Sequence, residues 1–431
     1  MTYLVELPYH RDASGYFAAL MDLPWAAWLD SGGMGRYDIL TAAPARTMQL
    51  DHSHPDPFGA LRQALGAPLL PLTDIPFAGG ALGYWGYDLS LAPDAKPTDA
   101  APPDMAVGIY DWAVVVDHQL QRARLVSRLR CAETAAQLPA ILARLCNPPP
   151  LPPSTFQVQG EVRANFTRAS YATAFARIQH YLHAGDCYQI NLAQRFSATA
   201  TGDAFGAYCD LRQRSPAPYS AFLNFPDLQI LCASPERFLQ VTAGKVETKP
   251  IKGTRPRGST PLQDQQLRES LRHHPKDRAE NVMIVDLLRN DLSQSCTTVR
   301  VPKLFEIESF AHVHHLVSTV TGQLRTGCDA LDVLRDCFPG GSITGAPKQR
   351  AMQIIAELEP HRRGVYCGTI GYVGFDGKMD TNIVIRTLVY HQGEIACWAG
   401  GGIVADSHVD AEYQETLDKA GAMLDLLQRY R

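Results

Sequence analysis

A run of prolines about one third of the way along the chain constrains the fold more than any other feature of this sequence. Residues 148–153 read PPPLPP, so five of six positions are proline. Proline lacks a backbone N–H and fixes φ, so this stretch excludes helix and favours a stiff, extended backbone. The sequence therefore divides into a region at residues 1–145, a proline-rich linker at 146–160 and a region at 161–431. A surface loop within one domain is the alternative interpretation.

Length and composition define the broad class of protein. The chain has 431 residues, of which 45% are apolar, and this excludes global disorder. The formal net charge of -4 disfavours a general nucleic-acid binder, which needs a concentrated basic surface. No stretch is long and apolar enough to span a membrane, the N-terminus lacks a signal-peptide layout, and the cysteines stand singly. We therefore expect a cytoplasmic protein with reduced thiols and with neither nucleic acid nor a membrane as partner.

The periodicity of apolar residues predicts both helices and strands. Helical spacing predicts helices over residues 167–186, 276–293 and 410–430. Runs rich in β-branched and aromatic residues predict strands within residues 105–116, 368–375, 381–390 and 394–404. The glycine-rich segment at residues 76–88 lacks the spacing of a dinucleotide-binding fingerprint, so we expect it to have a structural role.

Acidic side chains recur one helical turn apart on two of these helices. Asp277 and Glu280 share a face of one helix, and Glu412 and Glu415 repeat the spacing on the last helix. Solvated helix faces are the simpler interpretation of either pair alone. If the two pairs converge, however, they form an oxygen-rich pocket of the kind that Mg²⁺ prefers.

Basic residues crowd the segment ETKPIKGTRPRG at residues 247–258. A solvated face or an anion-binding patch is the simpler interpretation of such a charge run. The alternative is a reactive amine, because neighbouring cations and burial both disfavour the protonated form of Lys252.

Two other segments resemble ligand motifs without matching them. GGSITGAPK at residues 340–348 fails the phosphate-loop pattern, because Ala-Pro separates its last glycine from the lysine. HVHHLVS at residues 312–318 holds three histidines but has no further ligands at metal-binding spacing. We expect these histidines to be structural or to contact a substrate.

Eight motifs occur together in one order along the chain: GDCYQINLAQRF, ASPERF, PIKGTRPRG, DRAENVMIVDLLRND, HVHHLVSTV, GGSITGAPKQRAM, MDTNIVIRTL, and AGGGIVADS with EYQETLDKA. The set resembles the chorismate-utilising enzymes, and within that family the members that form aminodeoxychorismate for 4-aminobenzoate and folate synthesis. The resemblance covers essentially the whole chain. It implies an α+β fold, a large body of two packed β-sheets flanked by helices, in which the proline-rich linker need not separate independent domains.

The resemblance implies chorismate as the substrate and Mg²⁺ as the cofactor. Glu280 and Glu415 stand at the positions of the metal ligands, with Asp277 and Glu412 as water-mediated neighbours. Arg386 stands where the family grips a substrate carboxylate. The other residues that the resemblance assigns to the substrate site are Tyr366, Lys419, Gly400, Gly402, His315 and Ser342.

Three further positions carry the implied chemistry. Glu236 matches the general acid that protonates the departing C4 hydroxyl, which requires a raised pKa. Lys252 matches the lysine that attacks C2 of chorismate in the aminodeoxychorismate-forming members. Gln189 replaces the lysine that activates water in isochorismate and salicylate synthases, and a glutamine cannot be that base.

The resemblance also implies partners and alternatives. The chain has no glutaminase motif with a nucleophilic cysteine, so we expect ammonia to come from a separate glutamine amidotransferase subunit. Residues 215–222 resemble a segment that forms a tryptophan pocket, which is either occupied or empty here. An anthranilate-forming enzyme is the main alternative, against which Lys252 argues. A non-catalytic tryptophan-sensing relative is a second alternative. The acidic and basic residues expected of an active enzyme are all present, which argues against it.

Overall fold

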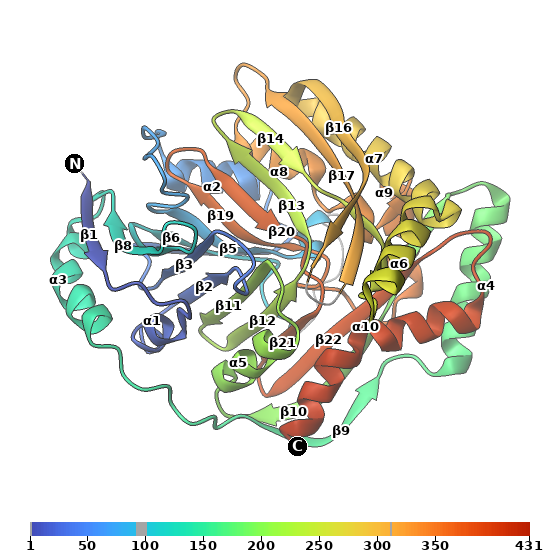
Figure 1. Ribbon diagram of the computed structural model, residues 1–431, viewed down its shortest axis with the longest axis horizontal. Coiled ribbons are helices and arrows are strands. Elements are labelled where there is room, and N and C mark those ends of the chain that lie inside the picture. Colours follow the sequence, from blue (N-terminus) through green and yellow to red (C-terminus); the bar gives the residue numbers. More distant parts are fainter. Residues whose placement is uncertain (1, 92–100, 311–312) are drawn as a thin grey trace.

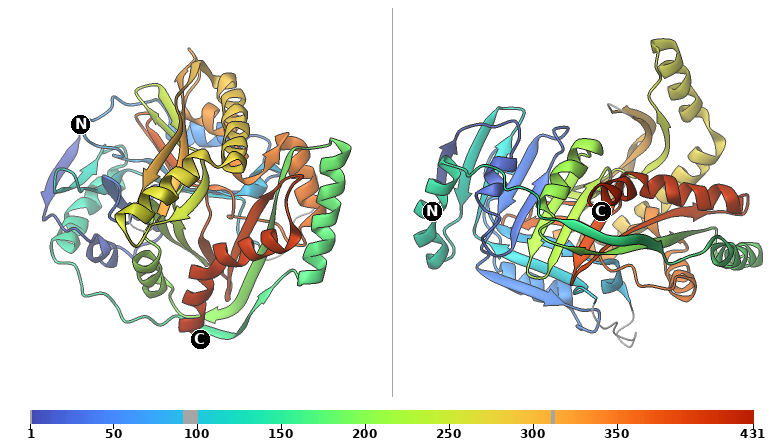
Figure 2. Two further views of the ribbon diagram at one scale, coloured as in Figure 1. Left: turned by 45° about the vertical axis from the view of Figure 1, so that its right-hand side comes forward. Right: turned by 90° about the horizontal axis from the view of Figure 1, so that it is seen from below.

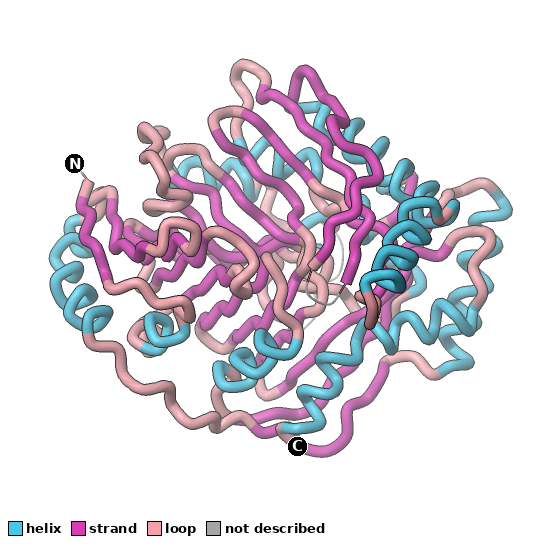
Figure 3. The backbone as a smooth tube through the Cα atoms, viewed as in Figure 1, coloured by secondary structure: helices cyan, strands magenta, loops and turns pink. Residues whose placement is uncertain are grey.

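Two antiparallel β-sheets pack face to face, and helices cover the face of each sheet that points away from the other (Figures 1 and 3). The structure is a computed structural model that describes residues 2–91, 101–310 and 313–431. The expected α+β body of two packed sheets flanked by helices is thus confirmed.

The first sheet runs across the lower part of Figure 1. Its strands, in spatial order, are β1 (Tyr3–Leu7), β8 (Arg122–Ser127), β7 (Trp112–Asp117), β3 (Tyr37–Thr41), β2 (Ala26–Asp30), β11 (Tyr219–Phe225), β12 (Leu228–Ser234), β21 (Thr387–His391), β22 (Glu394–Ile403), β10 (Gln189–Thr201) and β18 (Gly345–Ala346). Strand β9 (Gln157–Ala164) pairs with β10 beside this path.

The second sheet lies above the first in the same view. Its strands, in spatial order, are β15 (Ile251–Pro256), β17 (Val313–Leu324), β14 (Lys245–Thr248), β13 (Arg237–Thr242), β20 (Met379–Asn382), β19 (Thr369–Gly374), β5 (Gly80–Trp85), β6 (Met105–Tyr110) and β4 (Arg46–Leu50). Strand β16 (Cys296–Ser309) pairs with β17.

The helices form the outer layers. They are α1 (Ser14–Ala18), α2 (Pro57–Leu65), α3 (Ala132–Cys146), α4 (Arg168–Ala184), α5 (Phe205–Arg214), α6 (Pro261–His273), α7 (Pro275–Ser295), α8 (Ala330–Cys337), α9 (Lys348–Leu358) and α10 (Val409–Arg429), with 3₁₀ turns η1 (Tyr87–Ser90) and η2 (Gly341–Ile343). Helices α4, α7 and α10 confirm the three helices expected from periodicity. Helix α10 packs on β22 and contacts α4 at the edge of the first sheet (Figure 2).

Alternate residues of the first sheet face two different cores. Trp28 and Leu40 pack beneath helices α1 and α5, whereas their neighbours Ala27 and Ile39 pack against the second sheet. This period-two pattern follows from the pleat of a β-strand, which points successive side chains to opposite faces.

Two of the expected strand runs each cross from one sheet to the other. Residues 105–116 form β6 in the second sheet and β7 in the first, and residues 381–390 form β20 in the second and β21 in the first. Each crossing lies at a polar side chain, Asp111 in the first segment and Arg386 in the second, between strands whose residues are mostly buried. These crossings bring the two sheets together along shared chain segments.

The proline-rich linker forms neither helix nor strand between residues 147 and 156. It carries the chain from α3 along the lower edge of Figure 1 to β9, which begins at Gln157. Each sheet contains strands from both sides of this linker, so residues 1–145 and 161–431 build both sheets jointly.

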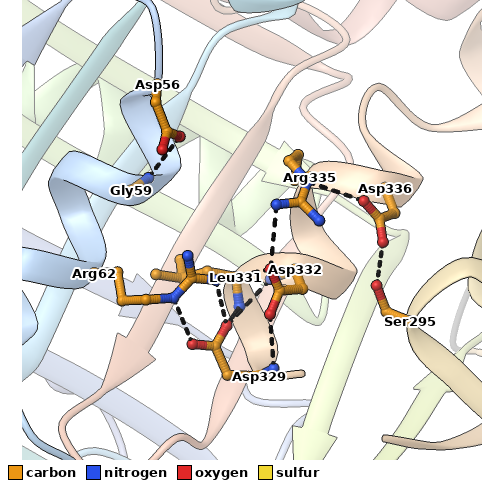
Figure 4. A network of polar contacts seen from close by, with 9 residues as sticks. All are labelled: Asp56, Gly59, Arg62, Ser295, Asp329, Leu331, Asp332, Arg335 and Asp336. Atoms are coloured by element: carbon orange, nitrogen blue, oxygen red, sulfur yellow. Dashed lines mark hydrogen bonds and ion pairs between the residues drawn. The ribbon is translucent and has the colours of Figure 1, made fainter. Parts of the chain in front are cut away.

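A polar network joins helix α2 to helix α8 (Figure 4). The guanidinium of Arg62 donates to both carboxylate oxygens of Asp329, at 2.8 and 3.0 Å, and to Asp332 at 2.8 Å. Asp329 in turn caps α8 by accepting hydrogen bonds from the backbone N–H groups of Leu331 and Asp332. Because α8 packs on α7, the network links the first region of the chain to the helix that carries Asp277 and Glu280.

The cysteines are free thiols, and most of them are buried. Within the described ranges, no helix is both long enough and apolar enough to cross a membrane.

Candidate active site

A cavity of about 630 Å³ opens beside the strand ends where the two sheets diverge. Strand β15, helices α7 and α10, and the glycine-rich end of β22 all contribute to its walls. Thirteen of the fourteen expected site residues line it: Glu236, Lys252, Asp277, Glu280, His315, Ser342, Tyr366, Arg386, Gly400, Gly402, Glu412, Glu415 and Lys419. Residues far apart in sequence therefore meet in one site.

Chain crossings between the sheets deliver two of the charged groups. Glu236 lies between β12 of the first sheet and β13 of the second, and Arg386 lies between β20 and β21. Arg386 has a φ of 51°, in the left-handed region that non-glycine residues seldom adopt. Backbone strain of this kind concentrates at functional sites, where the surrounding structure holds it in place.

Glu236 contributes a carboxyl group to the cavity wall. Its side chain is buried, and burial raises the pKa of this carboxyl above its usual value. The nearby Lys252 lowers the pKa and so limits the shift. The backbone N–H of Ile251 faces Oε1 of Glu236 at 3.5 Å. The expected raised pKa of a general acid is thus found at this position.

Lys252 enters the cavity from an irregular part of strand β15. The pairing of β15 with β17 shifts register between Ile251 and Thr254, which is a bulge of the kind common beside active sites. Gly253 has a φ of +78°, and a Cβ there would lie 2.7 Å from Cγ of Asp277. Glycine is therefore required at this position for the backbone to turn Lys252 inward.

The pKa of the Lys252 amine is lowered, mainly by burial. Glu280 opposes the shift, whereas the ammonium of Lys419 adds to it. The amine donates to the backbone carbonyl of Ser342 at 3.3 Å. A larger neutral fraction of this amine makes it a better nucleophile near neutral pH.

The cation beside Lys252 is not one of its sequence neighbours. Lys249 pairs with Glu308 at 2.8 Å, Arg255 pairs with Asp277 at 3.0 Å, and Arg257 pairs with Asp264 at 2.7 Å. Each of these charges is neutralised locally, so burial and Lys419 account for the lowered pKa of Lys252 instead.

Arg386 presents a guanidinium suited to bind an anion. Across residues 2–91, 101–310 and 313–431, no carboxylate forms an ion pair with Arg386. Burial lowers the pKa of Arg386, and the nearby carboxyl of Glu236 opposes this shift. The ring of Tyr366 stands beside it in the cavity wall and stacks on Trp398, with ring centroids 6.1 Å apart. A ligand carboxylate is the natural partner for such a fork.

Consecutive glycines in β22 allow strand β10 and helix α10 to approach this strand closely, one from each side. A Cβ at Gly400 would lie 2.6 Å from the carbonyl oxygen of Leu192 on β10. A Cβ at Gly401 would lie 2.9 Å from Oε2 of Glu412. The glycines therefore let β10 pair tightly on one side and let the acidic residues of α10 reach the cavity on the other.

The four acidic residues converge as the helical spacing allowed. Each has a cation near it: Asp277 lies 3.0 Å from Arg255, Glu415 lies 2.6 Å from Lys419, and Lys276 lies 3.9 Å from Glu280 and 3.8 Å from Glu412. Burial raises the pKa of both Glu280 and Glu412. Crowded carboxylates of this kind need positive charge to remain ionised.

The donor set fits Mg²⁺ in its chemistry. All four groups are carboxylates, the ligand type that this ion prefers, and Oε2 of Glu412 is buried without a hydrogen-bond partner in the described structure. In the described ranges, no three histidine, cysteine or acidic side chains are already gathered closely enough to hold a metal.

His315 stands on β17 with its imidazole facing the hydroxyl of Thr254. Nδ1 of His315 lies 2.9 Å from Oγ1 of Thr254. Burial lowers the pKa of His315 to about 4, and the positive charge of Arg386 adds to the shift. The imidazole is therefore neutral at physiological pH. His312, the first histidine of the same sequence segment, lies outside the described residues.

Gln189 is the one expected site residue that does not line the cavity. Its side chain is fully buried behind the β22 backbone, where a Cβ at Gly402 would lie 2.5 Å from its Nε2. In the described structure, neither polar atom of its amide has a hydrogen-bond partner. Contact between Gln189 and a substrate thus remains a prediction.

Sequence patterns did not single out Arg363, which supports the cavity from behind. Its guanidinium is 1% exposed and pairs with Glu359 at 2.6 Å. It also donates to the backbone carbonyls of Ile343 at 2.8 Å and Asn191 at 2.9 Å, on two walls of the cavity. Its partners come from distant segments, so no local spacing in the sequence indicates the role.

The sequence is similar to those of known proteins over nearly its whole length. Residues 25–425 match the family described as chorismate binding enzyme. The chain is 46% identical to proteins named aminodeoxychorismate synthase component 1 from Klebsiella aerogenes, over 99% of both chains, and from Escherichia coli (strain K12), over 99% of this chain and 98% of that protein. It is 40% identical to anthranilate synthase component 1 of Streptomyces coelicolor, over 93% of this chain and 82% of that one.

Solved structures lead to the same family. Anthranilate synthase component I from Streptococcus pneumoniae TIGR4 matches with a TM-score of 0.81 and 33% identity, over 90% of this chain and 92% of that one. The isochorismate synthase MenF from Escherichia coli shares the fold, with a TM-score of 0.77 at 19% identity, over 99% of this chain and 95% of that one. The chain belongs to the chorismate binding enzymes.

The low pKa of His315 predicts a specific dependence of stability on pH. The unfolded chain binds a proton at this residue below about pH 6.5, whereas the folded chain does so only near pH 4. Unfolding is therefore increasingly favoured as pH falls through this window. We expect urea denaturation of His315→Gln to show a shallower loss of stability between pH 6.5 and 4 than the parent chain. If the free energy of unfolding falls equally with pH in both proteins, the lowered pKa of His315 is contradicted.

Proposed function

We propose that the chain is the chorismate-aminating component of an aminodeoxychorismate synthase, which converts chorismate and ammonia to 4-amino-4-deoxychorismate. The observation that carries this proposal is Lys252, an amine with a lowered pKa in the same cavity as Glu236 and the unpaired Arg386. The relatives that are 46% identical over the whole chain support the same activity.

Chorismate is a dicarboxylate, and the cavity offers two means of binding its charges. Arg386 would bind one carboxylate through a charge-assisted fork, with Tyr366, Lys419 and the backbone amides of Gly400 and Gly402 completing the anion site. The other carboxylate faces an acidic wall, which would repel it without a bridging cation. Ser342 and His315 would contact the ring from the remaining walls.

Glu280 and Glu415 would hold the Mg²⁺ directly, and Asp277 and Glu412 would hold it through water. The ion supplies a bridging positive charge between the acidic wall and the substrate carboxylate. Burial of Glu280 and Glu412, with the orphaned Oε2 of Glu412, supports this assignment.

In the first proposed step the neutral amine of Lys252 attacks C2 of chorismate. The C2–N bond forms, the ring double bonds shift, and the C4–O bond breaks. Glu236 donates its proton to the departing hydroxyl, which leaves as water. Burial raises the pKa of Glu236 and lowers the pKa of Lys252, and both shifts favour the protonated acid and the neutral amine that this step requires.

In the second proposed step ammonia attacks C4 and expels Lys252 from C2. The C4–N bond forms, the double bonds shift back, and the Glu236 carboxylate accepts a proton from the incoming nitrogen. Two successive allylic displacements place nitrogen at C4, whereas direct attack by ammonia would place it at C2. Gln189 provides no base to activate water, which disfavours hydration as a competing reaction.

The main alternative is an anthranilate synthase component, to which the chain is also similar. That reaction adds nitrogen at C2 and needs no covalent lysine. The buried amine at position 252 supports the C4 product over this alternative.

A second cavity of about 460 Å³ lies between the sheets and includes Pro218, Tyr219 and Ser220 of the segment that resembles a tryptophan pocket. Arg237 lies over the ring of Tyr219, 5.1 Å from its centroid. We propose tryptophan as the ligand of this cavity, bound apart from the site of amination.

Removing the Lys252 amine tests the covalent mechanism. Lys252→Ala leaves Arg386 and the acidic residues in place, so we expect chorismate to bind while amination at C4 falls by orders of magnitude. Residual product should shift toward C2 and appear as fluorescent anthranilate after loss of pyruvate. The assay contains chorismate, Mg²⁺ and an ammonium salt, with products identified by mass and by lyase-coupled formation of 4-aminobenzoate.

Lys249→Ala is the matched control, because Lys249 lies three residues away and pairs with Glu308 beside the second cavity, outside the active-site cavity. It should retain C4 amination. Anthranilate as the product of the parent chain would favour the alternative function. Undiminished C4 amination by Lys252→Ala would exclude the covalent lysine.

The source of nitrogen provides a separate test. The sequence lacks a glutaminase motif, so the isolated chain should use ammonium and not glutamine. Addition of a glutamine amidotransferase subunit should confer glutamine-dependent turnover, measured as 4-aminobenzoate in the coupled assay. Glutamine-dependent turnover by the pure chain alone would contradict the proposal that a separate subunit supplies the ammonia.

A further inference from the structure

Lys276 occupies a position that helix stability does not explain. It is the second residue of α7, which begins at Pro275. The N-terminal turn of a helix carries partial positive charge, so a cation there is unfavourable. An acidic or neutral residue would suit this turn better, so the helix dipole does not account for a lysine here.

The contacts of Lys276 supply that reason. Its ammonium lies 3.9 Å from Oε1 of Glu280 on its own helix and 3.8 Å from Oε1 of Glu412 on α10. Glu412 is nearly inaccessible, with 4% of its side chain exposed, whereas 48% of the Lys276 side chain is exposed. The lysine thus reaches from solvent to a buried carboxylate and bridges the two helices that form the acidic wall.

We propose that Lys276 is a tethered competitor of the divalent cation, which neutralises the acidic wall and must withdraw when Mg²⁺ binds to these carboxylates. The inference rests on the proposed function, because it concerns the same acidic residues. Lys276 would offset part of the negative charge of Glu280 and Glu412 and so weaken the affinity for free metal. Metal would then bind firmly only when a substrate carboxylate adds its own negative charge.

The chemistry of lysine suits this exchange. Its ammonium is a compact point charge on a flexible stem, and half-exposure leaves room for it to swing into water. The neighbouring cations are held more firmly. Lys419 pairs with Glu415 at 2.6 Å and donates to the carbonyl of Gly400 at 2.9 Å, and Arg255 pairs with Asp277 at 3.0 Å. Lys276, with longer contacts to two carboxylates, is the cation most easily displaced.

The test is the direct binding of metal to the full-length chain without chorismate. Mg²⁺ affinity is measured by isothermal titration calorimetry, and Mn²⁺ affinity by electron paramagnetic resonance of the free ion. Lys276→Met removes the charge and keeps the apolar stem. We expect it to bind both ions about two- to fivefold more tightly than the parent chain, as expected for removal of a half-exposed ion pair.

Two variants separate this effect from general changes in charge. Lys276→Arg keeps the positive charge and should bind metal with an affinity near that of the parent chain. Lys303→Met removes the same charge from an exposed lysine on β16 that pairs with Glu306 and does not line the cavity. It should leave metal affinity unchanged.

Suppose that the parent chain binds Mg²⁺ and that Lys276→Met binds it equally or more weakly. That result would overturn the inference and leave the proposed function in place. Equal tightening by Lys303→Met would also overturn it, because the effect would then come from net charge alone. A parent chain that aminates chorismate but binds no metal would overturn both the metal assignment and this inference.

Discussion

The site depends on charged side chains that are buried where the chain crosses from one β-sheet to the other. The chain passes from one sheet to the other at Glu236 and again at Arg386, and each crossing carries a charged side chain into partly desolvated surroundings. Desolvation moves the pKa of each group toward its neutral form. Burial at the crossings therefore raises the pKa of the Glu236 carboxyl and lowers the pKa of the Arg386 guanidinium.

The cavity balances these charges against one another. Lys252 is flanked by Glu236 and Glu280, which favour its protonation, and by Lys419, which disfavours it. Removing any one member would change the pKa of the others, because the interactions act through a site that excludes much of the water. A dianionic substrate and a divalent cation add opposite charges to the same balance, so their binding is coupled to the state of the lysines.

Support for this arrangement comes from outside the cavity. Arg363 holds two walls together through backbone carbonyls, and its guanidinium lies over the ring of Tyr87 at the end of the glycine-rich segment. The Arg62 network joins α2 to α8, which packs on the helix that carries the acidic residues. Residues before the proline-rich linker thus stabilise a site whose lining comes from residues after it.

Much of the site could be predicted from the sequence, because its acidic pairs lie on regular helices and its motifs match a known family. The spacing of Asp277 and Glu280 fixes their common face without knowledge of the fold. The resemblance assigned Lys419 to the site, but sequence spacing pointed to the neighbouring basic residues as the cations that act on Lys252, and these pair elsewhere. The positions of the sheet crossings were also not predicted, because residues 105–116 and residues 381–390 each resemble a single strand run.

The central claim is that the buried amine of Lys252 bonds to the substrate. Intact-protein mass spectrometry after acid quench, with chorismate and Mg²⁺ present and ammonium absent, tests it most directly. The account predicts an adduct with the mass of chorismate less one water, mapped by proteolysis to the peptide that contains Lys252. No adduct, or an adduct on Lys249 or Lys419 instead, would contradict it.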